Sequence, residues 1–227
     1  MDGRYRLQVK AIDGVGNKVI SQSDYLYLDN TAPVATFEYL PANRTAQNVQ
    51  ALISFNEATT ITNNGGSSVY VFQDNGSFTF EYVDEVGNRG SKAATVDWID
   101  RNLPNATISI RDLQNQLVAA DEWVNHDLLV TISPSDYAVI ADLTWNGIAI
   151  ANVAEVSLYD EATNTYRVTN HGVLSYTLRD TDTMLESKDS ITVHIDKEPP
   201  KVKSERRTPE GWTTDSVTVT IVAEDAL

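Results

Sequence analysis

The chain has 227 residues, no cysteine and a formal net charge of −15 at pH 7. This acidic balance argues against a nucleic-acid partner, which would need basic patches to neutralise phosphate. Without cysteine there is no disulfide and no thiolate metal site, and no apolar run approaches the ~18 residues of a membrane helix.

Taken in chain order, short stretches alternate between apolar and polar residues. Such period-2 runs, rich in Val, Ile, Thr, Tyr and Phe, are typical of strands with one buried face. The runs span residues 5–11, 49–53, 78–82, 174–178 and 217–221. Gly- and Asn-rich turn sequences at 63–66, 74–76, 87–88 and 146–147 lie between them. Short strands at intervals of about ten residues predict an all-β fold of sandwich domains.

One pattern occurs three times at constant spacing. An alternating run ends in an aspartate, a second aspartate follows 16 residues later, and a proline follows that one by 4 residues. The three copies are Asp13, Asp29 and Pro33; Asp84, Asp100 and Pro104; Asp180, Asp196 and Pro200. Repetition in register indicates a tandem array of one structural unit. The short joint ending in proline is expected to be extended and stiff, because proline fixes φ and removes a donor.

The spacing predicts two complete repeats of this sandwich unit, residues 31–101 and the longer 102–197. We expect residues 1–30 to be the C-terminal part of a preceding repeat and 198–227 the N-terminal part of a following one. The chain is then expected to be a fragment of a longer array, with any signal or anchor outside it.

Two motifs carry a resemblance to a known family. Asp13-Gly-Val-Gly-Asn17 with Asp29-Asn-Thr-Ala-Pro33, and Asp84-Glu-Val-Gly-Asn88 with Asp100-Arg-Asn-Leu-Pro104, resemble the bacterial immunoglobulin-like repeats of large surface proteins, adhesins and cell-wall-associated enzymes. The third copy lacks the Gly-Asn pair. The resemblance implies a non-catalytic, extracellular spacer, stalk or adhesive module on a bacterial cell surface.

The resemblance also implies partners and an alternative function. The expected partners are neighbouring repeats of the same chain, with a cell-surface glycan or protein as a further partner, and no membrane insertion within this segment. The alternative is an accessory, glycan-binding module of a secreted polysaccharide-degrading enzyme. Family resemblance does not decide between these functions.

The repeated acidic residues are the candidate metal site. We expect Asp13, Asn17 and Asp29 to converge at the end of one repeat, and Asp84, Asn88 and Asp100 at the end of the next. Calcium, the candidate cofactor, prefers six to eight oxygen ligands, which these side chains would supply in part. The competing interpretation is structural, because an aspartate before a turn caps backbone amides and Gly-Asn supplies positive φ.

The aromatic residues and histidines give weaker signals. A tryptophan on a sandwich strand usually packs in the core, although Trp145, in a Trp-Asn-Gly turn, is the most plausible exposed sugar contact. His126, His171 and His194 lie in no metal-ligand or nucleophile motif. We therefore predict no catalytic site.

Overall fold

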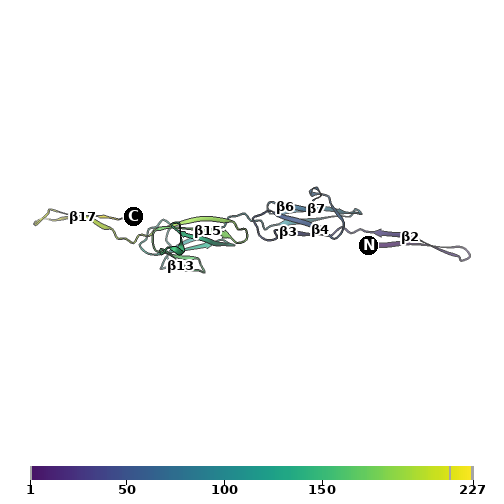
Figure 1. The fold of residues 1–227 in the computed structure, drawn as a ribbon, viewed down its shortest axis with the longest axis horizontal. Helices are drawn as coiled ribbons and strands as arrows, with labels where there is room; N and C mark the ends of the chain where they lie inside the picture. The colour runs from purple at the N-terminus through teal and green to yellow at the C-terminus, as the bar shows by residue number, and fades with distance from the viewer. Residues whose placement is uncertain (1, 215, 226–227) are drawn as a thin grey trace. The chain divides into compact units, whose positions relative to one another are not determined.

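The computed structural model describes residues 2–214 and 216–225, and every regular element in this part of the chain is a strand or a short 3-10 turn. The chain divides into two compact units, Met1–Arg101 and Asn102–Leu227. Figure 1 shows the strands of each unit. Over the described residues, no helix is long and apolar enough to span a bilayer.

The first unit holds a hairpin and a complete sandwich. Strands β1 (Gly3–Ile12) and β2 (Lys18–Leu28) form a two-stranded antiparallel sheet of their own. The sandwich has one sheet in the order β3-β4-β6 and another in the order β5-β7-β8. Its elements are β3 (Ala35–Leu40), β4 (Val49–Phe55), β5 (Thr59–Ile61), η1 (Asn64–Gly66), β6 (Val69–Phe72), β7 (Gly76–Asp84) and β8 (Arg89–Val96).

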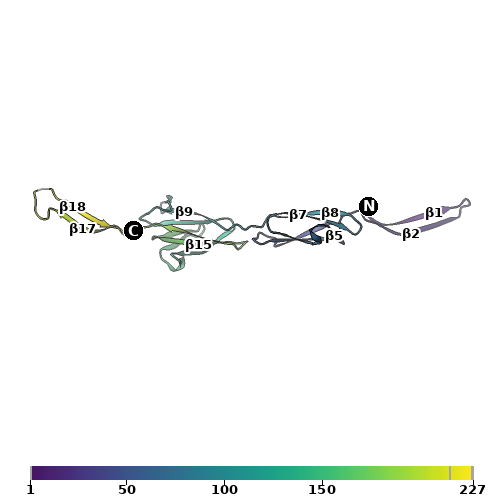
Figure 2. The same ribbon diagram turned by 90° about the horizontal axis from the view of Figure 1, so that it is seen from above.

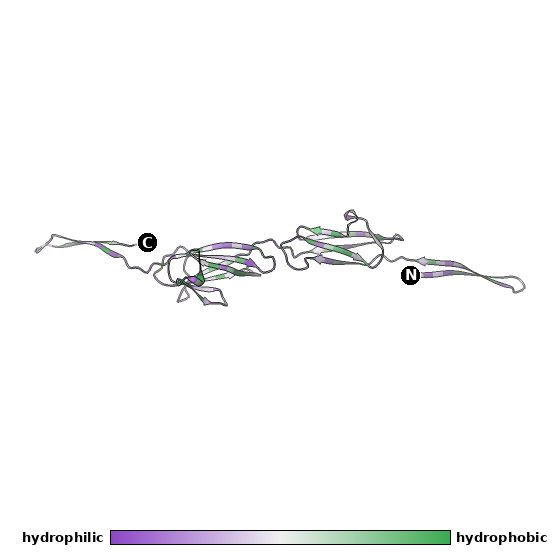
Figure 3. Ribbon diagram, viewed as in Figure 1, coloured by the Kyte–Doolittle hydropathy of each residue, from purple (hydrophilic) through white to green (hydrophobic). Residues whose placement is uncertain are grey.

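The core of this sandwich confirms the predicted strand phase. Val49, Ala51 and Ile53 on β4 are buried, as are Phe80 and Tyr82 on β7, with Phe78 packed against them. The alternation follows from the strand period of two, which places every second residue between the sheets. Figure 3 shows hydrophobic and hydrophilic residues alternating along the strands.

The second unit holds a larger sandwich followed by a hairpin. One sheet has the order β13-β14-β10-β9 and the other β12-β11-β15-β16, and Figure 2 shows β9 and β15 in opposite layers. The elements are β9 (Ala106–Asp112), β10 (Leu128–Pro134), β11 (Ala138–Trp145), β12 (Ile148–Ala149), η2 (Ile150–Asn152), β13 (Val156–Asp160), β14 (Thr165–Val168), β15 (Gly172–Asp180) and β16 (Glu186–Val193). The final hairpin consists of β17 (Lys201–Thr208) and β18 (Thr218–Glu224).

This strand order is that of an immunoglobulin-like sandwich. Lettered in chain order, β9, β10, β14 and β13 form the A-B-E-D sheet, and β11, β15 and β16 form the C-F-G sheet of the constant-type arrangement, to which the short β12 adds an edge strand. The first sandwich has the same plan, but each of its sheets has three strands instead of four. The chain is therefore an all-β protein of tandem immunoglobulin-like sandwiches.

The two hairpins keep the alternating pattern but leave it uncovered. Val9, in β1, is 54% exposed, whereas Phe80, at the matching place before the repeated aspartate, is 0% exposed. Val219, in β18, is 49% exposed, whereas Val130, which follows Trp123 by seven residues just as Val219 follows Trp212, is 0% exposed. In the described structure each hairpin thus presents an apolar face that a complete sandwich buries.

Candidate functional site

The repeated aspartates organise the turns that follow them. Asp84 Oδ1 accepts hydrogen bonds from the backbone N–H groups of Val86, Gly87 and Asn88 at 2.7–2.9 Å, and its Oδ2 accepts one from Asn88 Nδ2 at 2.8 Å. Gly87 has a φ of 102°, which a residue with a side chain rarely adopts. These contacts support the structural interpretation of the motif.

The other copies use the same chemistry. Asp13 Oδ1 accepts from the N–H groups of Val15 and Asn17 at 3.0 and 2.8 Å, and Asp13 Oδ2 accepts from Asn17 Nδ2 at 2.7 Å. Asp180 Oδ1 accepts from the N–H groups of the two residues at 182 and 183, even though the Gly-Asn pair is missing there. The aspartate is thus the part of the motif that the turn requires.

Electrostatics at Asp84 favour the charged carboxylate. Burial of this side chain, which is 8% exposed, acts to raise its pKa. The hydrogen bonds from Asn88, Gly87 and Val86 outweigh that effect and hold the pKa of Asp84 below its ordinary value. The turn therefore carries a fixed negative charge at neutral pH.

The expected convergence of each Asp/Asn set is wrong. Asp13 and Asn17 lie at the tip of the β1–β2 hairpin, next to the Ile12–Lys18 pair, whereas Asp29 follows the far end of the ladder, where Gly3 pairs with Leu28. Asp13 and Asp29 therefore lie at opposite ends of β2. The distance between them is about the length of that strand, in which each residue rises about 3.3 Å.

Asp84 and Asn88 are separated from Asp100 in the same way. They lie at the turn between β7 and β8, and Asp100 lies beyond the other end of β8. There its Oδ2 forms an ion pair with Arg44 Nη2 at 2.8 Å. Asp100 therefore lies at the opposite end of the sandwich from Asp84 and Asn88.

The structure instead groups acidic residues from different parts of the first unit. Carboxylate oxygens of Asp29, Glu57 and Asp84 all lie within 4.8 Å of one another. Asn88 Nδ2 also reaches the carbonyl oxygen of Asp29 at 3.3 Å. Three carboxylates at this spacing could hold a hard cation, although Asp84 already accepts four hydrogen bonds. Asp29 and Asp84 come from the sequence-predicted set, and Glu57, in the β4–β5 loop, has no sequence signal.

Each sandwich also fixes the chain segment that leads into it. Val34 N donates to Asn56 Oδ1 at 2.6 Å, Asn56 N donates back to Val34 O at 3.2 Å, and Lys92 Nζ donates to Ala35 O. We call this set the incoming clamp.

The second sandwich repeats the incoming clamp with different side chains. Asn105 N donates to Ser135 Oγ at 3.2 Å, Ser135 N donates to Asn105 O at 2.7 Å, and Ser187 Oγ donates to Pro104 O. Pro33 and Pro104, the prolines of the repeated motif, are both buried.

The segment that leaves each sandwich is held in a second way. Thr45 N donates to Trp98 O at 3.1 Å and Asp100 N donates to Thr45 O at 2.8 Å, which makes a parallel bridge between Thr45 and Ile99. Val124, His194 and Asp196 form the same bridge in the second sandwich, at 3.1 and 2.8 Å. We call this pair of bonds the outgoing clamp.

The tryptophans divide between core and surface. Trp145 is 3% exposed, so the expectation that it is the most plausible sugar contact is wrong. Its indole lies over Gly172, where an added Cβ would come within 2.4 Å of the ring. Trp98 packs edge-on against Tyr39, with ring centroids 5.2 Å apart. The Asn-Gly sequence predicts the turn that follows Trp145, but it does not predict whether the indole ring points into the core or toward solvent.

An aromatic cluster that the sequence did not reveal lies at the outgoing pole of the second sandwich. The rings of Trp123 and His171 stack with centroids 4.9 Å apart, and His194 lies 4.9 Å from Trp123 and 5.4 Å from His171. Trp123 is 45% exposed. A shallow cavity of about 480 Å³ adjoins it, lined by Glu122, Trp123, Val124, Asn125, His126 and Asp196. Only tertiary structure brings these loops together.

Comparison with known proteins gives no family assignment. No protein-family model and no curated protein matches the chain. Among solved structures, murine CEACAM1b is 14% identical, with 72% of this chain and 100% of that chain covered and a TM-score of 0.32. A chimeric titin Z1Z2 carrying an exogenous decorin peptide is 12% identical, with 75% and 100% covered and a TM-score of 0.26. PcdhgB3 EC1-4 is 12% identical, with 86% and 66% covered and a TM-score of 0.29. Values this low carry no information on what the chain binds or does.

Proposed function

We propose that the chain is a non-catalytic segment of immunoglobulin-like repeats that spaces or presents other domains on a bacterial surface. The observation that supports this function is the pair of clamps on each sandwich. Asp100 is held by the outgoing clamp of the first sandwich, and Pro104 and Asn105 are held by the incoming clamp of the second. Only residues 101–103 lie between the two clamps.

The physical argument is one of conformational freedom. A flexible linker samples a wide range of distances, whereas clamped backbone has few free dihedrals. Pro104 further restricts its own φ and the residue before it. A joint of this kind suits a stalk whose purpose is to hold its distal part away from its base.

Distance distributions between the two sandwiches test the proposal. Because the natural chain has no cysteine, Ser91→Cys and Ser157→Cys provide two unique labelling sites, both exposed. Pulsed electron-paramagnetic resonance should give a narrow distribution. Ser187→Ala, which removes one bond of the incoming clamp, should broaden it, whereas Ser77→Ala, which removes a serine bond inside the first sandwich, should not. A broad distribution for the natural sequence would refute a spacer function.

Glycan binding is the second candidate, as an adhesive or enzyme-accessory module. The exposed Trp123 beside Glu122, Asn125 and Asp196 favours it, since an aromatic face with hydrogen-bonding groups around it suits a sugar ring. Binding to cell-wall and plant polysaccharides should be lost with Trp123→Ala and kept with Trp212→Ala, whose indole lies outside this cavity. Equal binding by both variants, or none by the natural chain, would rule this function out.

Calcium binding stays a proposal with a changed ligand set. We propose Asp29, Glu57 and Asp84 as its protein ligands, in place of Asp13, Asn17, Asn88 and Asp100. A ligand that binds only the folded state raises stability by mass action. Calcium should therefore raise the melting temperature of the natural chain, less so for Glu57→Gln, and equally for the control Glu81→Gln. Identical melting curves in calcium and in chelator would remove the proposal.

A further inference from the structure

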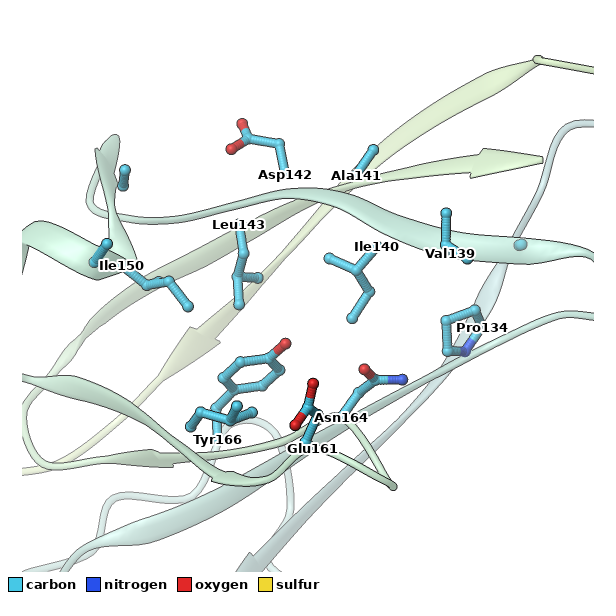
Figure 4. A pocket seen from close by; sticks show the side chains of 14 residues that line it. Pro134, Val139, Ile140, Ala141, Asp142, Leu143, Ile150, Glu161, Asn164 and Tyr166 are labelled. Atoms are coloured by element: carbon cyan, nitrogen blue, oxygen red, sulfur yellow. The ribbon is translucent and has the colours of Figure 1, made fainter. Parts of the chain in front are cut away.

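A groove opens between the two sheets of the second sandwich, away from the poles. Its volume is about 580 Å³, and it lies between β11 on one side and the β13–β14 hairpin on the other (Figure 4). This size falls within the range of small-molecule sites. The walls are mostly aliphatic, with contributions from Pro134, Ile140, Leu143, Ile150 and Leu158.

A β-bulge shapes one wall of the groove. Ile140 pairs with Leu178 and Leu143 pairs with Tyr176, so the register of β11 against β15 shifts by one residue between Ile140 and Asp142. In a regular strand, side chains three residues apart point to opposite faces. The extra residue lets Ile140 and Leu143 both point into the groove, while Asp142 points away, as Figure 4 shows. Bulges of this kind re-aim side chains and are frequent beside binding sites.

The opposite wall carries an unpaired polar group. Tyr166 on β14 is only 7% exposed, and its hydroxyl has no hydrogen-bond partner among the described residues. In Figure 4 this hydroxyl projects from the β14 side toward Ile140 and Leu143. The hydroxyl oxygen is not itself buried but opens onto the groove, so a ligand there can form a hydrogen bond with it.

Two further polar side chains flank Tyr166. Glu161 and Asn164 belong to the turn between β13 and β14, and both line the groove. Asn164 adopts a φ of 50°, and its backbone is held by bonds with Glu161 O at 3.3 Å and with Ile132 N at 3.1 Å. The side chains of Glu161 and Asn164 make no hydrogen bond or ion pair with the described part of the chain. The turn therefore presents free acceptors at a fixed place.

The charge of the lining selects the sign of the ligand. The 14 lining residues include no lysine, arginine or histidine, and Glu161 is the one charged lining residue whose side chain does not point away from the groove. A primary ammonium group has three N–H donors. Three acceptors face the groove: the hydroxyl oxygen of Tyr166, the carboxylate of Glu161 and the carbonyl oxygen of the Asn164 side chain. The aromatic ring of Tyr166 would add a favourable interaction with a cation.

We propose that this groove binds a small organic cation, consisting of a primary ammonium group on an apolar body. The ammonium group is held by Tyr166, Glu161 and Asn164, and the apolar body lies against Ile140, Leu143 and Ile150. This site is separate from the clamps and from the Trp123 cluster, so its occupancy does not depend on the spacer function.

The test uses the full chain and three probes of similar shape. The probes are 4-phenylbutylammonium, 4-phenylbutanol and 4-phenylbutyrate, and binding is followed by amide chemical shifts in a titration. For an ammonium probe of this size we expect a Kd of about 0.1–1 mM. The shifts should centre on β11 and the β13–β14 turn. The alcohol should bind at least about 5-fold more weakly, and the carboxylate should not bind measurably.

Matched substitutions inside and outside the groove distinguish the loss of a polar contact with the ligand from an effect of the substitution on the protein as a whole. Glu161→Gln should weaken ammonium binding by about 5- to 10-fold and Tyr166→Phe by about 3- to 10-fold. The controls Glu210→Gln and Tyr159→Phe, which change the same groups outside the groove, should leave the Kd unchanged. Ala151→Trp, at an exposed lining position, should block binding. Equal affinity for ammonium and alcohol, shifts centred elsewhere, or no response of the ammonium Kd to Glu161→Gln and Tyr166→Phe would overturn the proposal.

Discussion

Replacing Phe80 with alanine should destabilise the first sandwich by about 3–5 kcal/mol, the range found when a core aromatic residue is removed. Its side chain is 0% exposed, and its ring centroid lies 5.7 Å from that of Phe37 and 5.0 Å from that of Phe78. The change therefore leaves a cavity between the sheets and removes two aromatic pairs, each worth about 0.5–1.5 kcal/mol within that total.

This loss is large for a domain of such size. At about 0.05–0.15 kcal/mol per residue, a sandwich of roughly 70 residues has about 4–10 kcal/mol of stability in all. The Phe80→Ala variant should thus come close to unfolding at room temperature. Hydrogen exchange measured by mass spectrometry against urea reports each sandwich separately, so the second sandwich serves as the internal reference.

The control is Thr79→Ala, on the opposite, exposed face of the same strand, which should change stability by less than about 0.5 kcal/mol. A loss below about 1 kcal/mol for Phe80→Ala would refute the reasoning. It would mean that β7 presents its other face to the core, since a shift of one residue exchanges the two faces.

Three further outcomes are expected. Gly90→Ala should destabilise the first sandwich by about 1–3 kcal/mol in urea titrations, because its Cβ would lie 2.4 Å from the Tyr82 ring; an unchanged midpoint would contradict this packing. The hydrogen bond from Lys197, opposed by desolvation, holds the pKa of Asp127 below its ordinary value. The ion pair of Asp127 with Lys197 should stabilise the fold above about pH 4, and this stability should be lost as the pH falls through the lowered pKa of Asp127 in the folded state. The Asp127→Asn variant should therefore have a lower melting temperature at pH 7, and its melting temperature should change less with pH below 4. The uncovered hairpins should make the chain associate with rising concentration in sedimentation runs, while residues 31–200 stay monomeric; identical sedimentation of both would argue against this.

Much of the fold could be predicted because burial imposes a period of two. Val49 and Phe80 were assigned to the core from alternation alone, and the structure buries both completely. The plan of each sandwich follows from the same pattern together with the turn residues between strands. The role of the aspartates that precede turns could also be predicted, because their carboxylates accept hydrogen bonds from backbone N–H groups only two to four residues further along the chain.

The sites depend on distances that sequence spacing does not give. Sixteen residues separate Asp84 from Asp100 in the chain, but a strand converts that interval into opposite ends of the sandwich. Glu57 joins Asp29 and Asp84 only because three loops meet at one pole. Of the tryptophans, the sequence makes Trp145 the most plausible exposed one because a turn follows it, yet Gly172 leaves room for its indole in the core. The groove depends on a one-residue register shift in β11, which has no sequence signature.

The outgoing clamp has a mechanical consequence. Its two strand segments run parallel, one early in each sandwich and the other at its end, so pulling the chain from both sides drives them in opposite directions along their length. Hydrogen bonds loaded in that way share the tension and break together, whereas those of an antiparallel hairpin pulled from its open end break one at a time. The bonds of Thr45 and Val124 are therefore loaded in shear when the chain is stretched, and we expect the two bonds at each position to add to the force that a sandwich resists.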